Sequence, residues 1–489
     1  MNHTRADVIV LGGGGAGLAA AIEAAAAGAR VVLLEKNPHL GGSTAWSVGS
    51  ISVNGSPHQL RAGLRDSADA HFEDLETLAG ALAHRDNLAL RRLLVDNIAD
   101  TFDWLLGMGL VFSGPMPEPP HRVARMHNVL PNSRAFAHRL ARRARALGVD
   151  IRTGACVESL LVDGPTITGV RANDTARGRH EHHAGAVVLA GGDYSASPEL
   201  LGELASAQAA RLTPVNPTAS GDGLRLGREV GGIIRNGDLV RGPVLRFVPP
   251  PARTLLDRLP ASPLLAHALR AGFEHLPRAL VRPFLMRFLT TALGLSRPLL
   301  DAGAMLVNAH GERFADERDR PAHATASQPH GTAYVLLDAR LAAHFSAWPH
   351  YVSTAPGIAY AYLDDYRRAR PDVFHRAHTL DALGRRAHLD PQALRRSLDA
   401  RNALADRPPL DTPPWTVLGP VRAYLPFTEG GLAVDTSMRV LRANDTPIPG
   451  LFAAGANGQG GLLLEGHGHH LGWAFVSGRL AGRAAAGTI

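Results

Sequence analysis

Three glycines and one carboxylate near the N-terminus have the residue types and the spacing of a nucleotide-binding site. Gly12, Gly14 and Gly17 follow a short apolar run, and Glu35 closes the next one. Gly12 permits a tight turn, Gly14 lets the backbone approach a pyrophosphate, and Gly17 lets a helix pack closely on a sheet. A carboxylate at the position of Glu35 can accept hydrogen bonds from a ribose 2′-hydroxyl. These residues predict a site for a dinucleotide.

The elements that would position these residues lie between residues 6 and 36. An apolar run at 8–11 predicts a buried parallel strand, an alanine-rich segment at 18–27 predicts a helix, and a second run at 31–34 predicts the next strand. The start of such a helix favours phosphate groups. A glycine-rich turn without a ligand would leave the glycines at 12–15 unexplained, because each costs more backbone entropy than any other residue.

The combination of apolar strand and glycine returns later in the chain, at 187–192 and at 449–455. Between these segments, Asp222 stands near the start of a predicted helix, where a carboxylate suits the helix dipole. A polar, glycine-bearing loop at 37–49 suits contacts to a flat ligand through backbone N–H groups and short side chains. A last helix is predicted at 471–481. Because the last strand and this helix repeat the opening theme, the middle of the chain is predicted to be an insertion, with the ligand between the two parts.

The remaining chain is predicted to form helices, a hairpin and one unusual segment. Helices are predicted at 60–110, 133–147 and 379–402, and a β-hairpin at 149–170. Segment 249–300 alternates proline with Leu- and Arg-rich helical stretches and resembles an amphipathic helix at a membrane surface. The favoured interpretation of this segment is a pair of cap helices that cover a pocket or pack on a partner subunit. Peripheral membrane contact through 249–300 stays open as the alternative.

The composition excludes several classes of protein. Cys156 is the only cysteine of the 489 residues, so the chain has no intramolecular disulfide, iron–sulfur cluster or zinc–cysteine site. The net charge of +7 could attract anionic partners, but no arginine tract resembles a nucleic-acid-binding arm, and no nucleic-acid partner is expected. The first strand begins too early for a signal peptide, and no apolar run is long enough to span a membrane. A cytoplasmic protein without a transmembrane segment is the expectation.

Further motifs extend the opening pattern over nearly the whole chain, and together they resemble one flavoprotein family. They are Gly41-Gly42-Ser43-Thr44, LAGGDY at 189–194, SGDGL at 220–224, VNxxGERF at 307–314, TxGGL at 428–432 and PGLFAAG at 449–455. The family includes fumarate reductase, the succinate dehydrogenase flavoprotein subunit, urocanate reductase and the 3-ketosteroid dehydrogenases. The resemblance implies an α/β fold in which a Rossmann-like FAD-binding domain, residues 1–240 and 428–489, carries an inserted α+β capping (substrate) domain, residues 241–427.

The resemblance also implies the cofactor and the residues that hold it. The cofactor is FAD, and it is expected to be non-covalent, because the loop 43–46 lacks the histidine that carries flavin in succinate dehydrogenases. Val157 would hold adenine through its backbone, and Ala456 replaces the glutamate that usually follows AAG. The expected cofactor-binding residues are Gly12, Gly14, Ala16, Gly17, Glu35, Lys36, Gly42, Ser43, Thr44, Gly49, Val157, Gly191, Asp222, Gly455, Ala456, His470 and Leu471.

Two positions depart from the members of the family that bind dicarboxylates. Pro426-Phe427 stands where fumarate reductases carry two histidines, and Glu465 stands where they carry an arginine before the final helix. A second carboxylate next to Glu465 would be repelled. Fumarate and succinate are therefore not expected as substrates.

Candidates for the catalytic groups follow from the same resemblance. The catalytic arginine of the family lies shortly after the GxRF motif, where this chain offers Arg318 and Arg320, with Arg320 preferred. A surface salt-bridge cluster at 316–320 is an equal alternative for each. Glu465 and His467 complete the set, and either His467 or His469 is expected to face the substrate. No metal is predicted at 466–470 because no carboxylate shell is evident, and the tyrosines of the cap cannot be aligned with an acid–base group.

These features predict an FAD-dependent oxidoreductase that acts on CH–CH groups. Hydride would pass between flavin N5 and a C–C bond α,β to a carbonyl, as dehydrogenation or ene-reduction, in a bulky or weakly charged substrate. The partners are that small molecule and an unidentified electron donor or acceptor. The alternative enzyme is a fumarate-reductase-like reductase of an anionic unsaturated acid, clamped by Arg318, Arg320, Arg241 or Arg422. A catalytically silent flavin scaffold is the non-enzyme alternative, and an RNA-binding flavoprotein lacks an aromatic and basic platform.

Overall fold

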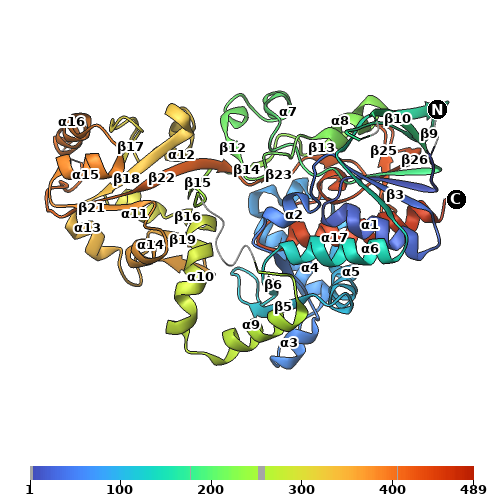
Figure 1. Ribbon diagram of the computed structural model, residues 1–489, viewed down its shortest axis with the longest axis horizontal. Helices are drawn as coiled ribbons and strands as arrows, with labels where there is room; N and C mark the ends of the chain where they lie inside the picture. The colour runs from blue at the N-terminus through green and yellow to red at the C-terminus, as the bar shows by residue number, and fades with distance from the viewer. Residues whose placement is uncertain (1–3, 177, 252–258, 405, 489) are drawn as a thin grey trace.

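Two lobes make up the structure, a computed structural model that describes residues 4–176, 178–251, 259–404 and 406–488. The lobe on the right of Figure 1 carries both ends of the chain, and the lobe on the left is formed from the yellow and orange middle of the chain. Each lobe has its own hydrophobic core. The first core draws mostly on residues 6–190 and 432–485, and the second on residues 194–425.

The first lobe is built on a six-stranded sheet in the order β25-β26-β11-β2-β3-β7. Its strands are β2 (Val8–Leu11), β3 (Val31–Glu35), β7 (Asp150–Thr153), β11 (Ala186–Leu189), β25 (Arg439–Leu441) and β26 (Pro447–Ala453). All are parallel except β25. Every residue of β2, β3 and β11 is buried, as expected for strands covered on both faces. The chain leaves β2 toward β3 on one side and meets β11 on the other, which places a ligand crevice at the carboxyl end of β2.

Three helices cover one face of this sheet: α1 (Gly15–Ala26), α6 (Arg134–Ala146) and α17 (His469–Ala486) (Figure 1). The predicted strand, glycine turn, helix and strand of the opening segment are confirmed. Helix α1 begins at Gly15, three residues before the predicted start, because the glycine turn already has helical geometry there. Helix α17 extends the predicted helix at 471–481 at both ends.

Helices α1 and α17 approach each other closely enough that only glycine fits at two positions. A Cβ at Gly478 would lie 2.4 Å from the carbonyl oxygen of Ala16, and a Cβ at Gly482 would lie 2.2 Å from that of Ala20. One buried carboxylate adds to this contact, because Glu23 accepts hydrogen bonds from the guanidinium groups of both Arg479 and Arg483. The carboxyl-terminal helix is therefore fixed against the nucleotide-binding unit.

Smaller elements complete the first lobe. A four-stranded sheet, in the order β1-β10-β9-β8, contains β1 (Thr4–Arg5), β8 (Ala155–Asp163), β9 (Thr166–Asp174) and β10 (Gly178–His183). A second small sheet contains β4 (Ser50–Ser52), β5 (Val111–Met116) and β6 (Met126–Leu130). The helices are α2 (Gly42–Trp46), α3 (Pro57–Arg61), α4 (Ala68–Ala79), α5 (Leu88–Gly107) and α8 (Asp222–Glu229).

The second lobe is organised around the long strand β22 (Trp415–Leu425). Its sheet has the order β12-β22-β18-β17, and two further strands pair with β22. These strands are β12 (Thr213–Pro214), β15 (Val244–Phe247), β17 (Met305–Val307), β18 (Thr332–Leu337) and β21 (Phe374–Ala377). A separate sheet holds β16 (Gly294–Leu295), β19 (Ser353–Ala355) and β20 (Ala359–Ala361). The helices are α7 (Pro198–Leu204), α11 (Arg297–Asp301), α12 (Pro321–Ala326), α13 (Ala339–His344), α14 (Leu363–Ala369), α15 (Leu380–Ala387) and α16 (Pro391–Asn402), the last two being the predicted pair at 379–402.

The chain crosses between the lobes along two neighbouring strands. Strand β14 (Val240–Arg241) pairs antiparallel with β23 (Phe427–Thr428), so the outgoing and returning crossings lie side by side. Strand β13 (Ile234–Arg235) precedes the outgoing crossing and β24 (Gly431–Leu432) follows the returning one. These two strands also pair antiparallel. The domain boundaries at 240 and 428 stay a prediction, and the second core also takes in Tyr194, Leu200 and Leu224, which precede residue 240.

A helical hairpin forms a second connection below the crossing. Helix α9 (Pro263–His275) packs on β5 and β6 of the first lobe, and α10 (Arg278–Ala292) packs on α14, β15 and β20 of the second (Figure 1). This hairpin is the central part of the segment predicted at 249–300. Residues 252–258 of that segment lie outside the described residues.

The close contact between α1 and α17 predicts an opposite effect of glycine-to-alanine changes in two helices. Gly482→Ala should lower the free energy of unfolding by about 1–3 kcal/mol, because overpacking against a backbone carbonyl outweighs the better helix propensity of alanine. Gly202→Ala in α7 is the matched control, since a Cβ there meets nothing within 4 Å. It should be neutral or stabilising. Urea unfolding of both variants measures the difference, and an equal or higher stability of Gly482→Ala would contradict the predicted contact.

Candidate functional site

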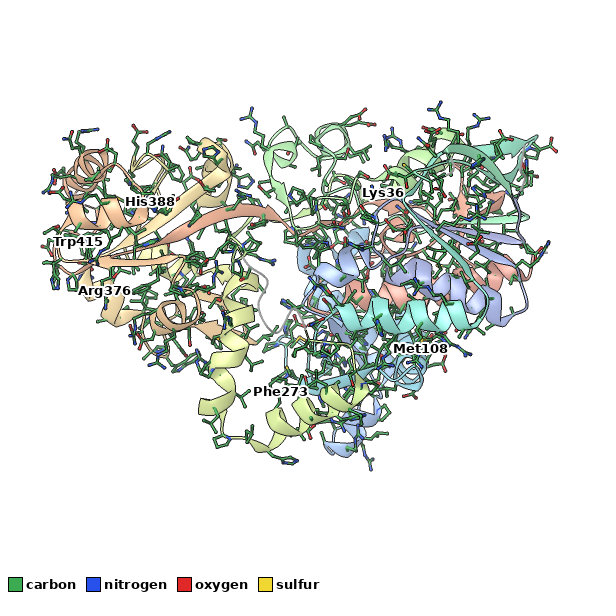
Figure 2. All side chains as sticks on the ribbon, viewed as in Figure 1. Lys36, Met108, Phe273, Arg376, His388 and Trp415 are labelled. Atoms are coloured by element: carbon green, nitrogen blue, oxygen red, sulfur yellow. The ribbon has the colours of Figure 1, made fainter. Side chains whose placement is uncertain are left out.

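A cavity of about 1310 Å³ lies where the two lobes and the helical hairpin meet. Its first wall consists of the carboxyl ends of β2, β3, β11 and β26 and the loop that precedes α17, and its second wall comes from β15, β22, α9 and α10. Figure 2 shows two of the lining residues, Lys36 on the right-hand lobe and Phe273 on α9 below the gap between the lobes. The predicted insertion of a capping domain agrees with this arrangement, and the position of the ligand between the two parts stays a prediction.

The glycine turn opens onto this cavity. Gly12 has φ of +101°, and a Cβ there would lie 2.4 Å from the carbonyl oxygen of Ala190 on the neighbouring strand. A Cβ at Gly14 would meet only the carbonyl oxygen of Gly41, at 3.9 Å, so the backbone at Gly14 faces open space. The N-terminus of α1 follows at once, and helix N-termini favour phosphate groups. The turn therefore fits a pyrophosphate that approaches the backbone.

Glu35 connects the turn to the loop that follows β3. Its Oε2 accepts a hydrogen bond from the backbone N–H of Gly13 at 2.7 Å, and its Oε1 accepts from the backbone N–H of Asn37 at 2.8 Å. The side chain is buried but lines the cavity. Because each carboxylate oxygen can accept more than one hydrogen bond, these contacts leave room for a ribose hydroxyl. The structure thus shows Glu35 bound within the loop and at the wall of the cavity.

Lys36 holds Asp222 at the rim of the same wall. The Lys36 Nζ lies 2.7 Å from Asp222 Oδ2 and also contacts the hydroxyl of Ser220. Burial opposes the charge of the Asp222 carboxyl, but the hydrogen bond and the charge of Lys36 outweigh it and lower its pKa. Ser43 accepts a hydrogen bond from Asn216 at 2.9 Å and so joins the loop after β3 to the same region.

Most of the predicted cofactor-binding residues line the cavity, and two do not. Those on the cavity wall are Gly12, Gly14, Ala16, Glu35, Lys36, Gly42, Ser43, Thr44, Val157, Gly191, Asp222, Gly455, Ala456, His470 and Leu471. Gly17 serves helix packing, since a Cβ there would lie 1.9 Å from the carbonyl oxygen of Gly12. Gly49 has φ of +83° and packs beside Val129. Asn457, the residue after Ala456, accepts a hydrogen bond from the backbone N–H of Gly191 at 2.6 Å.

A cluster of charged side chains lies behind the loop at 464–471. Arg241 binds two carboxylates, Glu429 at 2.5 Å and Glu465 at closer range. Burial disfavours the charge of Glu429, yet His470 and Arg241 lower the pKa of this carboxyl to about 2. Burial raises the pKa of Glu465. The ring of Phe427 lies 3.9 Å from that of His470 and covers it. Glu465 itself does not line the cavity in this structure, because it turns toward Arg241.

The three histidines of this loop contact three different partners. His467 lines the cavity, and Glu118 accepts hydrogen bonds from its backbone N–H at 2.8 Å and from its Nδ1 at 2.6 Å. Because a carboxylate only accepts hydrogen bonds, His467 donates through Nδ1. Its other ring nitrogen, Nε2, stays available for proton transfer. His469 turns into the protein toward His71, and His470 lies 3.7 Å from Glu429. Among the described residues, no group of three or more potential metal ligands was found.

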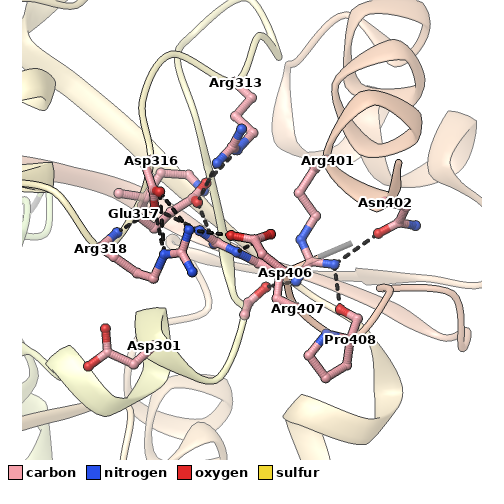
Figure 3. A network of polar contacts seen from close by, with 12 residues as sticks. Asp301, Arg313, Asp316, Glu317, Arg318, Arg401, Asn402, Asp406, Arg407 and Pro408 are labelled. Atoms are coloured by element: carbon pink, nitrogen blue, oxygen red, sulfur yellow. Dashed lines mark hydrogen bonds and ion pairs between the residues drawn. The ribbon is translucent and has the colours of Figure 1, made fainter. Parts of the chain in front are cut away.

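The two predicted catalytic arginines are not brought to the cavity. Arg318 binds Asp316 at 2.8 Å and also contacts Asp406, within the polar network that Figure 3 shows on the second lobe. Arg320 is exposed at the start of α12. Neither lines the cavity, because the segment after β17 follows the ion pairs of the network instead of turning toward the first lobe. The structure places Arg318 in the salt-bridge cluster that was its alternative interpretation.

Two residues on the cavity wall were missed from the sequence. Glu118 stands in the proline-rich loop 115–120, where a lone acid has no spacing that marks it. Arg246 lies on β15 and lines the cavity from the second lobe, with a buried Nε that has no hydrogen-bond partner among the described residues. Burial lowers the pKa of the Arg246 guanidinium. The only signal that could have indicated this arginine is its place as a single charge within the apolar run at 244–247.

Known proteins resemble this chain along its whole length. Vinyl phenol reductase from Lactiplantibacillus plantarum is 28% identical over 99% of this chain and 97% of its own length. The open conformation of a flavocytochrome c3 fumarate reductase has a TM-score of 0.75, with 23% identity over 99% of this chain and 78% of that chain. The 3-ketosteroid Δ1-dehydrogenase from Sterolibacterium denitrificans has a TM-score of 0.66, with 16% identity over 99% of this chain and all of that chain.

The family comparison agrees with the geometry of the cavity. A family model described as an FAD binding domain matches residues 7–244 and 266–462, which include the glycine turn, Glu35, Asp222 and the strand that ends at Gly455. The cavity residues fit FAD through the open backbone at Gly14 and the carboxylate at the end of β3. The chain therefore belongs to the FAD-binding-domain family, and it is an FAD-dependent oxidoreductase.

Proposed function

We propose that this enzyme moves a hydride between flavin N5 and a C–C bond α,β to a carbonyl in a bulky, weakly charged substrate. When bound, FAD supplies the hydride acceptor or donor, and protein groups position the reacting carbon and move the proton at its neighbour. The relatives support the general reaction class, since they are named as reductases and dehydrogenases. The non-covalent attachment of FAD is part of the proposal.

The apolar second wall of the cavity is the observation that carries this proposal. Phe247 from β15 and Leu285, Met286 and Leu289 from α10 line the cavity, with Phe273 from α9. A wall of this kind favours a substrate with a large apolar surface, because burial of that surface contributes about 25 cal/mol per Å². A small dianion would leave most of this wall without a complementary partner.

The charges next to the loop at 464–471 support the same conclusion. Arg241 could clamp a carboxylate of a dianion, but Glu429 and Glu465 already bind its guanidinium. Releasing Arg241 would leave buried Glu429 with an uncompensated charge, which is costly. Phe427 stands at one of the two positions where fumarate reductases carry a histidine, and its ring offers no hydrogen bond. The side chains that would hold a second carboxylate are therefore neutralised or apolar.

The pair of His467 and Glu118 provides the proton transfer in this proposal. Glu118 fixes the ring through Nδ1, and the free Nε2 can give a proton to, or take one from, the carbon next to the site of hydride transfer. Both residues line the cavity. Arg318 and Arg320 remain alternatives for this role, and reaching the cavity would require the second lobe to move.

One specific observation favours a second candidate, a reductase of an unsaturated acid with a single carboxylate. The unpartnered Nε of Arg246 faces the cavity from the second lobe, and Arg422 pairs opposite it on β22. A carboxylate at this end of an otherwise apolar substrate would satisfy Arg246 and leave the reacting carbons toward the first lobe. Rapid mixing of reduced enzyme with a neutral enone, a monoanionic unsaturated acid and fumarate separates the candidates, and Arg246→Gln should weaken only the monoanion.

Denaturation should release intact FAD from the protein. Colour that stays with the precipitated chain would contradict non-covalent binding.

Glu35→Ala should weaken FAD binding by about 1–3 kcal/mol, because the variant loses charge-assisted hydrogen bonds to the ribose and to Gly13. Titration of the apoprotein with FAD measures this loss. Glu203→Ala is the control, since Glu203 binds only Arg228 on the surface, and its FAD affinity should be unchanged.

The proposed proton transfer predicts a slow but FAD-loaded variant. His467→Gln should lower the rate of the half-reaction with substrate about a hundredfold or more, since a positioned acid or base typically contributes ~10²–10⁴. Glu118→Gln should have a smaller effect in the same direction. Stopped-flow absorbance of the flavin measures both. His84→Gln, at an exposed site, is the control. Full activity of His467→Gln would move the role to another residue.

The neutralised Arg241 predicts that anion binding can be increased by one change. Glu465→Gln removes one of its two carboxylate partners, so fumarate should bind about tenfold more tightly to the variant than to the wild-type protein, as one charged hydrogen bond contributes ~1.5–3 kcal/mol. Perturbation of the flavin absorbance measures this affinity. Rapid reoxidation of the reduced wild-type enzyme by fumarate, with no response to ketones, would reject the leading proposal.

A further inference from the structure

The hairpin of α9 and α10 exposes large apolar side chains at its bend and at the start of α9. Leu264 is 83% exposed, Leu276 is 53% exposed and Leu280 is 68% exposed. Pro277 separates the two helices, so Leu276 and Leu280 lie on either side of the bend, at the lower edge of the molecule in Figure 1. Soluble proteins rarely gather exposed leucines in this way without a partner.

An aromatic cluster of the second lobe lies beside α10. The ring of Trp348, which is 65% exposed, contacts that of Tyr360 at 5.1 Å, and Tyr360 also contacts Tyr351 at 4.8 Å. Arg282 of α10 donates a hydrogen bond to the backbone carbonyl of Tyr360 at 3.0 Å, which joins the cluster to the hairpin. Tryptophan and tyrosine with leucine and arginine are the residues enriched at the boundary between lipid and water.

The charge of the hairpin indicates what kind of surface would cover it. Between residues 263 and 292 there are four arginines, at 270, 278, 282 and 287, and a single acid, Glu274. Arg287 is exposed and has no ion-pair partner among the described residues, and Arg270 reaches Glu274 only at 3.8 Å. Cationic side chains around exposed leucines complement anionic headgroups above an apolar interior. Arg282 is already paired with Asp365 at 2.6 Å. Arg287 is therefore the cation that an apolar protein surface would leave without a partner.

The inner side of the same hairpin forms part of the cavity wall. Phe273, Leu276, Val281 and Leu285 line the cavity, and two of them, Leu276 and Leu285, are also exposed at the surface. The cavity therefore reaches the surface along the hairpin. None of the described helices is long and apolar enough to cross a bilayer, so contact with lipid would be peripheral.

We propose that the hairpin of α9 and α10 docks on the surface of an anionic lipid bilayer, with Leu264, Leu276 and Leu280 in the interface and Arg287 on the headgroups. The entrance to the cavity then faces lipid, and an apolar substrate enters from the bilayer. The route of the substrate rests on the proposed function, whereas docking does not. A binding test without turnover therefore separates a failure of one from a failure of the other.

Flotation of the FAD-loaded full-length protein with vesicles tests the docking. Wild-type protein should float with phosphatidylcholine vesicles that contain about a third phosphatidylglycerol, and less with pure phosphatidylcholine or in high salt. Leu264→Ser/Leu280→Ser should lower the partition coefficient about tenfold or more, because the leucines lose their burial in lipid. Neither residue lines the cavity, so FAD content should not change. Val162→Ser is the matched control, because Val162 is an exposed apolar residue on β8 and does not belong to the hairpin.

Each other outcome overturns the proposal. Wild-type protein that floats with neither vesicle, or a double variant that floats as well as the wild type, excludes this surface as the docking site. Sedimentation of the same samples without vesicles measures whether the protein forms dimers. If the wild-type protein forms dimers that Leu280→Ser alone dissociates, and no protein floats, the leucines contact a second copy of the chain instead of a bilayer.

Discussion

Contact between backbones at the end of β2 is the constraint on which the cofactor lobe depends. A Cβ at Gly12 would meet the carbonyl of Ala190, and a Cβ at Gly17 would meet the carbonyl of Gly12. No larger residue fits at either position, since real side chains essentially never approach to such distances. The contact sets where α1 begins and how close β11 comes. It thereby brings the glycines of two strands and the carboxylate of a third to one edge of the sheet, where a long, flat, doubly charged ligand can lie across them.

How far the site could be predicted depended on whether a residue acts through local geometry. The glycine turn, Glu35 and Asp222 follow strands or open helices, so their places came from spacing alone. Glu118 meets His467 across 349 residues of sequence, and no local pattern reports such a contact. Arg318 could have served the cavity or a surface network, and its position depends on Asp406, which stands far along the chain. The side chains of the second lobe were the least predictable, because loops and ion pairs set them.

Charged side chains behind the polar wall of the cavity are balanced by one another. Arg241, Glu429, Glu465 and His470 balance one another without any ligand. Their arrangement spreads over residues that belong to both crossings of the chain and to the loop before α17. A change at one member leaves the others buried with unequal charge, which costs more than the lost contact alone.

The hairpin of α9 and α10 is also a mechanical link. Helix α9 is attached to the first lobe and α10 to the second, while the paired strands β14 and β23 carry the chain from one lobe to the other side by side. Any rotation of one lobe against the other about those strands must change the angle between the two helices at Pro277. The angle at this bend and the width of the cavity therefore change together. Whatever holds the tip of the hairpin still also sets how far the enzyme can open.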